Sequence, residues 1–324
     1  MTTLDPRTLH TEAQERLDAA HTDPRRLVLI HTGLVLLLSL LGNGLSLFLD
    51  SQISTTGGLS GLGTRSFLQT LQALISYSTM LFTPFWSAGF LLVAIRWATN
   101  APAKPRDLLS GFRRFTAVLA YQLLLTVGVF LLAQPCFYIA SFIFALTPYA
   151  EPMLELLEPV LTSGSLDALE SISMEAVWNV YTPMLIIFAV IMIPITIVLS
   201  YYLRLSQYFI MDAPGTGGFR SALLSFKAMG GHVLQMVRLD LHFWWYYLLE
   251  VLLTVICYLD YLLPMLGFTL PVDSTAAYFI TLVVYSILEI ALHLWKKAEI
   301  DTTYALAYRR IITPPQAIYS EPQK

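Results

Sequence analysis

Residues 178–203 read WNVYTPMLIIFAVIMIPITIVLSYYL, a stretch without one charged side chain. An α-helix needs about 20 apolar residues to cross the hydrocarbon core of a bilayer, and this stretch is longer than that. Five further apolar runs occur along the chain. The six predicted spans cover residues 27–49, 67–95, 115–146, 178–203, 239–266 and 276–295. The sequence therefore predicts an all-α fold: a polytopic membrane bundle of six transmembrane helices.

The composition agrees with a lipid environment. Apolar residues make up 56% of the chain and charged residues only 13%, whereas charged residues are about 25% of an average soluble domain. No basic surface interleaved with aromatic residues stands apart from the predicted membrane boundary, so nucleic acid is not an expected partner.

The basic residues indicate the topology. Of the 19 Lys and Arg residues, only Arg65 falls in the first, third or fifth connection between spans. The others lie in the two terminal segments and in the second and fourth connections. Basic residues flanking membrane spans stay on the cytoplasmic side. We therefore expect both termini to be cytoplasmic and the chain to cross the membrane six times.

Three regions follow from this topology. Residues 1–26 are expected to form a cytoplasmic amphipathic helix, because Asp5-Pro6 is a helix-start signal and Leu9, Ala13 and Leu17 follow at helical spacing. Residues 27–298 form the six-span membrane domain, and residues 299–324 a cytoplasmic C-terminal tail. Further short amphipathic helices are expected on the cytoplasmic side, within residues 107–115 and 219–229.

Several side chains are suited to anchoring the spans at the inner interface. Arg and Lys can extend their charged ends to headgroups while their stems stay in apolar surroundings, and Trp is enriched at this depth. The predicted anchors are Arg113, Arg114, Trp244, Trp245, Lys296 and Lys297. They make membrane lipids, with anionic headgroups at the cytoplasmic face, the expected partners. The cytoplasmic helices also offer a surface to a protein partner.

Some of these segments resemble a known family. Residues 222–232 read ALLSFKAMGGH, residues 239–245 read LDLHFWW, and residues 12–17 read EAQERL. With the later Ala305-Leu306-Ala307-Tyr308, they resemble a bacterial integral membrane protein family catalogued as domain of unknown function 975. The resemblance implies six spans in the bacterial cytoplasmic membrane and no established activity.

Two carboxylates lie deep inside the predicted spans. A rise of 1.5 Å per residue puts Glu250 about 16 Å and Glu289 about 12 Å from the inner ends of spans five and six. Because an ionised carboxylate at this depth costs roughly 2.5 kcal/mol or more, both should face the protein interior, with at least one protonated or paired. We hypothesise that Glu250 and Glu289 bind a proton or cation, which His293 and His242 relay toward the cytoplasm.

Two other interpretations remain open for these residues. The protonated acids can instead form interhelical hydrogen bonds with partners such as Tyr246, Tyr247, Thr254 or Ser286. A zinc site would need several of His31, His242, Glu289 and His293 to converge. This second alternative is weaker, because the spans offer neither a thiolate set nor an HExxH motif. We predict no metal, cofactor or catalytic residue.

The sequence thus supports three classes of function. The first is a non-enzymatic scaffold or regulatory membrane protein, favoured by the repeated basic interfacial helices and by the lack of a nucleotide-binding or catalytic motif. The alternative is a small secondary transporter or channel that uses Glu250 and Glu289, supported by prolines within spans two to four. An enzyme acting on lipid comes third, since Asp240 and His242 alone would have to supply its chemistry at the membrane boundary.

Overall fold

The computed structural model describes residues 4–55, 62–153, 155, 174–258 and 274–312. Every regular element in these ranges is a helix. Several predicted segments lie outside the described residues: the glycine-rich part of the first connection, most of the acidic third connection, the end of predicted span five and the last residues of the tail.

The chain divides into two compact units. The larger unit comes from residues 1–120 and 205–324, and the smaller from residues 121–204.

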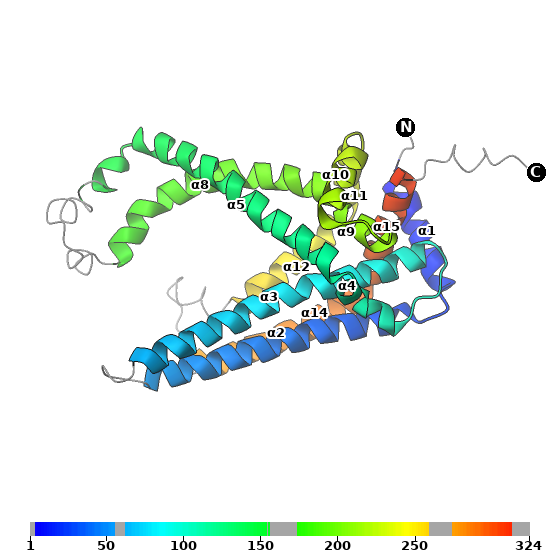
Figure 1. Ribbon diagram of the computed structural model, residues 1–324, viewed down its shortest axis with the longest axis horizontal. Helices are drawn as coiled ribbons and strands as arrows, with labels where there is room; N and C mark the ends of the chain where they lie inside the picture. The colour runs from blue at the N-terminus through cyan, green and yellow to red at the C-terminus, as the bar shows by residue number, and fades with distance from the viewer. Residues whose placement is uncertain (1–3, 56–61, 154, 156–173, 259–273, 313–324) are drawn as a thin grey trace, which may run out of the picture. The chain divides into compact units, whose positions relative to one another are not determined.

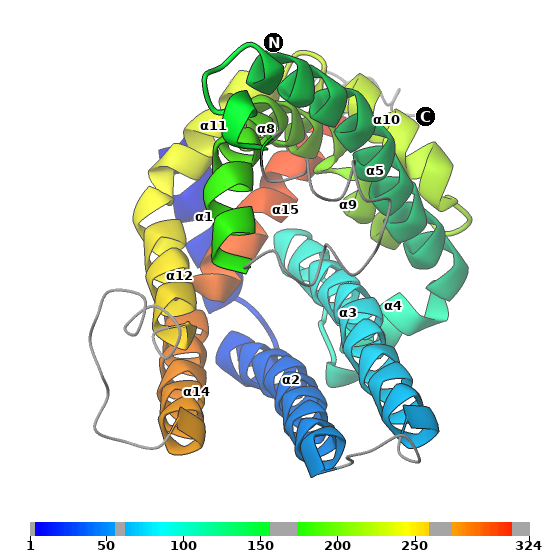
Figure 2. The ribbon, with the colours of Figure 1, turned by 90° about the vertical axis from the view of Figure 1, so that its left-hand side faces the viewer.

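Long helices form one part of the larger unit. Helix α2 (Pro24–Thr55) runs beside α3 (Leu62–Ala98), and α14 (Ser274–Leu292) lies beside both α2 and α12 (Trp244–Cys257). Figures 1 and 2 show these four helices side by side. After Leu292, α14 continues into a π-helical turn, η3 (His293–Lys297).

Predicted span five is not one straight helix. It is broken at Phe243, where α11 (Val233–His242) meets α12 at an angle of 68°. The buried residues Met236, Leu239 and Phe243 hold the amphipathic α11 on the rest of the unit. Asp240 and His242 therefore lie on a separate short helix, before the apolar part of the span begins.

Short helices form the other part of the larger unit, which we call the helical layer. Its members are α1 (Pro6–Asp18), η2 (Pro105–Leu109), α4 (Ser110–Arg113), α9 (Ser206–Asp212), α10 (Gly218–Met229), α11 and α15 (Ala298–Ile312). Helix α15 falls in the region predicted as the C-terminal tail, and every one of its residues 302–308 is buried inside the protein. It packs on α1 and α3.

Helix α1 confirms the helix predicted near the N-terminus. Asp5 caps it by accepting a hydrogen bond from the Thr8 backbone N–H at 3.3 Å, and Pro6 occupies its first position. Leu9, Ala13 and Leu17 form its buried face, as their spacing indicated.

Two glycines allow α3 to approach η2 and α4 closely. A Cβ atom on Gly89 would lie 1.9 Å from the Leu108 carbonyl oxygen, and one on Gly111 would lie 2.0 Å from that of Phe85. Neither site has room for a side chain. Two residues after the end of α3 at Ala98, Asn100 has a φ of 54°, in the left-handed region that Asn tolerates.

The smaller unit contains α8 (Met174–Leu203) and all but the first turns of α5 (Phe115–Ala145). The two helices touch where Phe137 meets Phe188 and where the Tyr121 hydroxyl donates to the Leu203 carbonyl at 3.2 Å. Large apolar side chains such as Phe130, Leu131, Ile186 and Val190 point outward. That arrangement suits a lipid environment and not water.

Among the described residues, four helical stretches are long and apolar enough to cross a membrane. They are Pro24–Ile53, Leu81–Ala98, Phe115–Ala145 and Tyr181–Asp212, and α11 with α12 makes a fifth if the bent pair is one span. The all-α fold class is thus confirmed for the described residues, with four or five candidate spans, and the count of six spans stays a prediction.

Candidate functional site

A polar site lies where α2, α12 and the π-turn η3 meet. The Nδ1 atom of His293 is hydrogen-bonded with the Thr32 hydroxyl at 3.0 Å, and its Nε2 atom lies 3.6 Å from Glu250 Oε1. The second contact is an ion pair when the imidazole is protonated. His293 therefore joins three elements that are far apart in the sequence.

More basic groups lie next to this pair. The buried His31 ring stacks on Phe90 with 4.6 Å between centroids, and Lys297 Nζ lies 5.5 Å from the centroid of the same Phe90 ring. Lys297 also lies 3.5 Å from Asp301. Among the described residues, His31 Nδ1 is a buried atom without a hydrogen-bond partner.

Glu289 lies one helical turn before His293 and lines a cavity of about 280 Å³ between α2, α12 and α14. Its Oε2 atom is buried and has no hydrogen-bond partner within the described part of the chain. Polar side chains make up much of the remaining wall: Ser39, Asn43, Thr254, Tyr258, Tyr285 and Ser286. The volume is enough for several water molecules or a hydrated ion, since one water takes about 30 Å³.

The cavity and the Glu250–His293 pair are neighbours along both helices. Glu289 and His293 are four residues apart, as are Glu250 and Thr254, which share one helix face in each case. Thr254 lines the cavity and donates its hydroxyl to the Glu250 carbonyl at 3.0 Å. Three of the four predicted ion-site residues, Glu250, Glu289 and His293, thus lie in one connected polar region.

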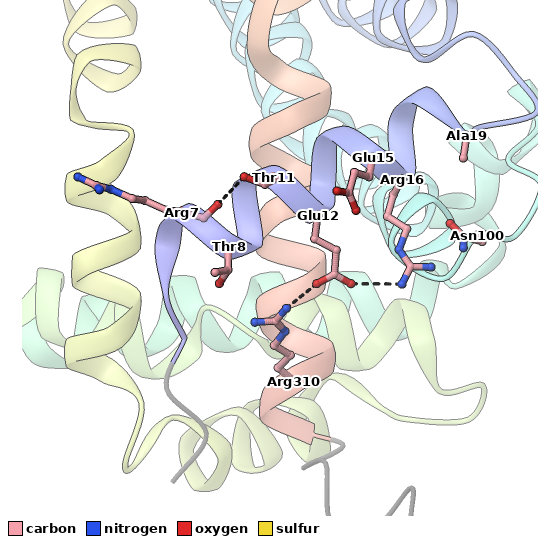
Figure 3. Close-up of a pocket in the computed structure, with 9 residues that line it drawn as sticks. All are labelled: Arg7, Thr8, Thr11, Glu12, Glu15, Arg16, Ala19, Asn100 and Arg310. Carbon is pink, nitrogen blue, oxygen red and sulfur yellow. Dashed lines mark hydrogen bonds and ion pairs between the residues drawn. The ribbon is translucent and has the colours of Figure 1, made fainter.

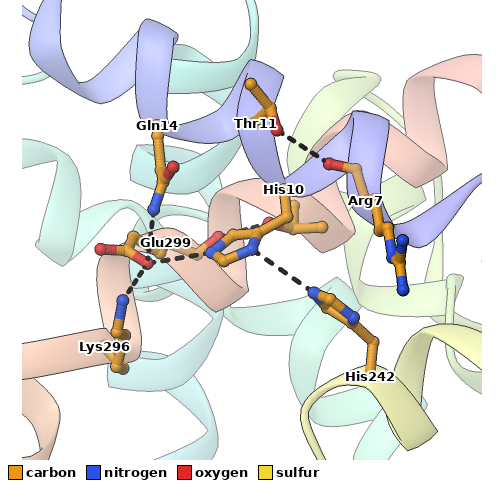
Figure 4. A network of polar contacts seen from close by, with 8 residues as sticks. Arg7, His10, Thr11, Gln14, His242, Lys296 and Glu299 are labelled. Carbon is orange, nitrogen blue, oxygen red and sulfur yellow. Dashed lines mark hydrogen bonds and ion pairs between the residues drawn. The ribbon is translucent and has the colours of Figure 1, made fainter.

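His242, the fourth predicted residue, belongs to a different group. The bend at Phe243 places it on α11, where its Nε2 atom lies 3.4 Å from His10 Nδ1. Figure 4 shows how His10 in turn reaches Glu299, at 3.1 Å, and how Lys296 meets the same carboxylate at 2.7 Å. This group ties α1, α11 and α15 together in the helical layer.

The Glu299 carboxylate is held in its charged form. Partial burial tends to raise its pKa, but hydrogen bonds from Lys296, His10 and Gln14 outweigh burial, so the pKa lies below its ordinary value. Its role in the helical layer is therefore that of a permanent anion at neutral pH.

A polar basin of about 720 Å³ opens on the surface beside α1, as Figure 3 shows. Glu12 stands in it between two arginines, pairing with Arg16 at 3.2 Å and with Arg310 of α15. Both arginines are thus paired with a carboxylate, and the Glu12–Arg310 pair links α1 to α15.

The predicted interface anchors differ in their surroundings. Arg113 and Trp244 are exposed, whereas Arg114 donates to the Ile210 carbonyl. Trp245 packs on Trp295 with 5.3 Å between ring centroids. Lys296 and Lys297 are mostly buried and paired with Glu299 and Asp301. The last two are thus bound within the protein, where sequence reasoning expected them at headgroups.

No group of three or more His, Cys, Asp or Glu side chains in the described ranges could hold a metal ion. His242 is also separated from the other residues considered for zinc, so the described residues offer no basis for a zinc site.

Sequence reasoning missed several polar partners. Thr32 was overlooked although it follows His31. Two further contacts join distant segments: Tyr304 donates to Asp240, and Tyr308 donates to Asp212 at 3.1 Å. A third is local, since Arg96 at the end of α3 donates to Asp107 in the following η2 at 2.6 Å. Of the residues in these hydrogen-bonded pairs, only the acids that lie inside otherwise apolar stretches could be recognised from the sequence.

In the described part of the chain every regular element is a helix, and four or five of the helical stretches are long and apolar enough to span a membrane, which places the chain in the class of membrane-embedded proteins. Over residues 6–313 the chain matches the family described as protein of unknown function (DUF975), and it belongs to that family. Neither the curated proteins nor the solved structures gave a match.

Proposed function

We propose that this chain is a six-span protein of the bacterial cytoplasmic membrane, with both termini cytoplasmic, that binds a proton or small cation at Glu250 and Glu289. In this proposal it works as a small secondary transporter or channel, without catalysis. The observation that carries the proposal is the buried Glu289 oxygen in a polar cavity among apolar helices. Buried carboxylate oxygens are nearly always hydrogen-bonded, and an ionisable side chain within a membrane span is by default a candidate functional residue.

The chemistry of the cavity favours a proton or a hard cation. Its wall offers hydroxyl, amide and carboxylate oxygens from Ser39, Asn43, Thr254, Ser286 and Glu289. Oxygen donors of this kind suit protons, water and hard ions, and they disfavour soft metals.

His293 supplies the proposed link toward the cytoplasm. It is adjacent to both acids and is the point where α14 changes to a π-helical turn, and single π-turns occur frequently at functional sites. The relay proposed here uses His293 with the neighbouring His31 and Lys297. His242 has no part in it, because it lies with His10.

Flux measurements on purified protein reconstituted into vesicles test the proposal. The unaltered chain should carry protons, Na⁺ or K⁺, and Glu289→Gln and Glu250→Gln should reduce that flux to the level of empty vesicles. Glu15→Gln, which changes an exposed carboxylate on α1, is the matched control and should leave flux unchanged. Equal flux from all four proteins would overturn the ion site.

A non-enzymatic scaffold remains the second candidate, supported by the helical layer. The buried α15 and its contact with α1 form a packed body outside the apolar spans, which a purely ion-carrying protein would not need. A stoichiometric protein partner that is lost when Arg310→Glu breaks the α1–α15 contact, together with absent ion flux, would favour this function over transport.

A further inference from the structure

Helix α10 buries its small residues and exposes its large apolar ones, the reverse of the usual pattern. Its inward face consists mainly of small or hydroxyl residues: Gly218, Ser221, Ala222 and Ser225, with Met229 at the end. Its outward face carries Phe219, Leu223 and Phe226, which are 65%, 50% and 42% exposed. These three positions follow one helical stripe. The large apolar side chains of this helix therefore point away from the protein.

The inward face is held by specific contacts. The Ser225 hydroxyl accepts a hydrogen bond from the Leu205 backbone N–H at 3.1 Å. The buried Ser221 hydroxyl is satisfied within α10, where it donates to the Gly218 carbonyl at 2.6 Å. Helix α10 packs on α9. The exposure of Phe219 and Leu223 is thus fixed by how the opposite face packs.

Positive charge accompanies the apolar stripe. Arg220 and Lys227 are exposed and each follows one of the outward aromatic residues. Helix α10 contains no acidic residue. An apolar stripe flanked by cations is the pattern of helices that lie in the surface of an anionic membrane.

The position of α10 in the larger unit fits such a surface. Figures 1 and 2 show that α10 runs across the direction of α2 and α3, and not along it. The chain passes from α10 through α11 directly to α12, and Trp244 at that junction is 58% exposed. Trp is typical of the membrane–water interface, which places the start of α12 at that interface. Only the short helix α11 lies between this point and α10 along the chain.

We propose that α10 lies in the plane of the cytoplasmic membrane surface and binds anionic lipid. Phe219, Leu223 and Phe226 enter the boundary between headgroups and acyl chains, and Arg220 and Lys227 contact lipid phosphates. Charge complementarity and continuity with the span favour lipid over a protein partner. The inference is independent of the ion site and rests only on the proposed cytoplasmic side.

An environment-sensitive fluorophore at residue 223 tests this inference in the full-length protein. Both cysteines are replaced by Ser, Leu223→Cys is labelled, and the protein is reconstituted into phosphatidylcholine vesicles with or without an equal amount of phosphatidylglycerol. Quenchers attached to the lipid acyl chains should quench the label, more strongly with the anionic lipid. A label at Glu15→Cys on α1 is the control and should not be quenched.

The charge contribution has its own variant. Arg220→Gln with Lys227→Gln should reduce the ratio of docked to undocked helix by about five-fold for each charge removed, in the anionic vesicles only. Equal quenching at residues 223 and 15 would overturn the inference. So would protection of the label that depends on protein concentration and not on lipid quenchers, because that result would assign the face to a second copy of the chain.

Discussion

His293 is the residue on which the polar site depends most, because each of its ring nitrogens faces a different helix. Thr32 lies at 3.0 Å on one side and Glu250 at 3.6 Å on the other. The π-turn that begins at His293 changes which face the following residues present. One imidazole therefore connects α2 and α12 to the end of α14, next to Glu289.

The Thr32 hydroxyl fixes the orientation of this ring, which leads to a first prediction. Thr32→Val keeps the shape of the side chain and removes the hydrogen bond, so we expect a loss of about 1 kcal/mol in the free energy of unfolding. Thermal unfolding in detergent measures it.

Thr126→Val is the control, because the Thr126 hydroxyl donates only within α5, to the Gln122 carbonyl at 3.0 Å. It should change stability by less than about 0.5 kcal/mol. If both variants behave alike, Thr32 does not hold His293 in place.

Glu299 gives the second prediction, on pH. Its pKa in the folded protein lies below the ordinary value of 4.5, so folding favours the charged form. The stabilisation is therefore complete above about pH 4.5 and is lost as the pH falls through the lower, folded value. We expect the stability difference between the unaltered chain and Glu299→Gln to shrink in acid. Unfolding midpoints at neutral and acidic pH check this, and a difference that grows in acid would contradict it.

At the scale of elements, the close contact of α3 with η2 and α4 depends on two glycines. Gly89→Ala and Gly111→Ala would each place a methyl group about 2 Å from a backbone oxygen. Because backbone cannot move aside as a side chain end can, we expect a loss of at least about 1–3 kcal/mol from each. Thermal unfolding or expression yield measures it.

Gly33→Ala is the matched control within a helix, since a Cβ atom there meets nothing within 4 Å. It should be neutral or stabilise by up to about 1 kcal/mol, owing to the better helix propensity of Ala. Equal losses at Gly33 and Gly89 would show that close packing is not the cause.

The long apolar helices were predictable from the sequence, and the break in span five was not. The predicted runs agree with the limits of α5 and α8 to within four residues, because length and apolarity alone define a span. Residues 239–245 read as the start of a similar run. Tertiary contacts place these residues on α11 and at the bend instead: Tyr304 donates to Asp240, and Leu239 and Phe243 are fully buried.

The same distinction applies to the candidate site. Glu250, Glu289 and His293 were recognisable, because a charged side chain inside an apolar run is conspicuous. The roles of Thr32 and His242 could not be predicted, since each depends on which helix lies opposite. His242 looked equivalent to His293 by depth, yet the 68° bend at Phe243 directs it to His10.

For the whole molecule, the positive-inside pattern predicts which side each end faces. Accessible tags inserted after Gly58 and within residues 151–175 should react with impermeant reagents on intact cells. Tags at either terminus should react only after the membrane is opened. Reaction of one terminal tag but not the other in intact cells would show an odd number of crossings, and reaction of both would show the opposite orientation; either result would contradict the predicted topology.

The most direct measurement for the polar site is infrared difference spectroscopy of the purified, reconstituted protein. Changing the pH, or replacing Na⁺ by a large organic cation, should produce a carboxyl band that is absent from Glu289→Gln and retained in the Glu15→Gln control. Identical difference spectra from the unaltered chain and Glu289→Gln would mean that Glu289 binds neither proton nor cation, and that its place in the membrane is structural.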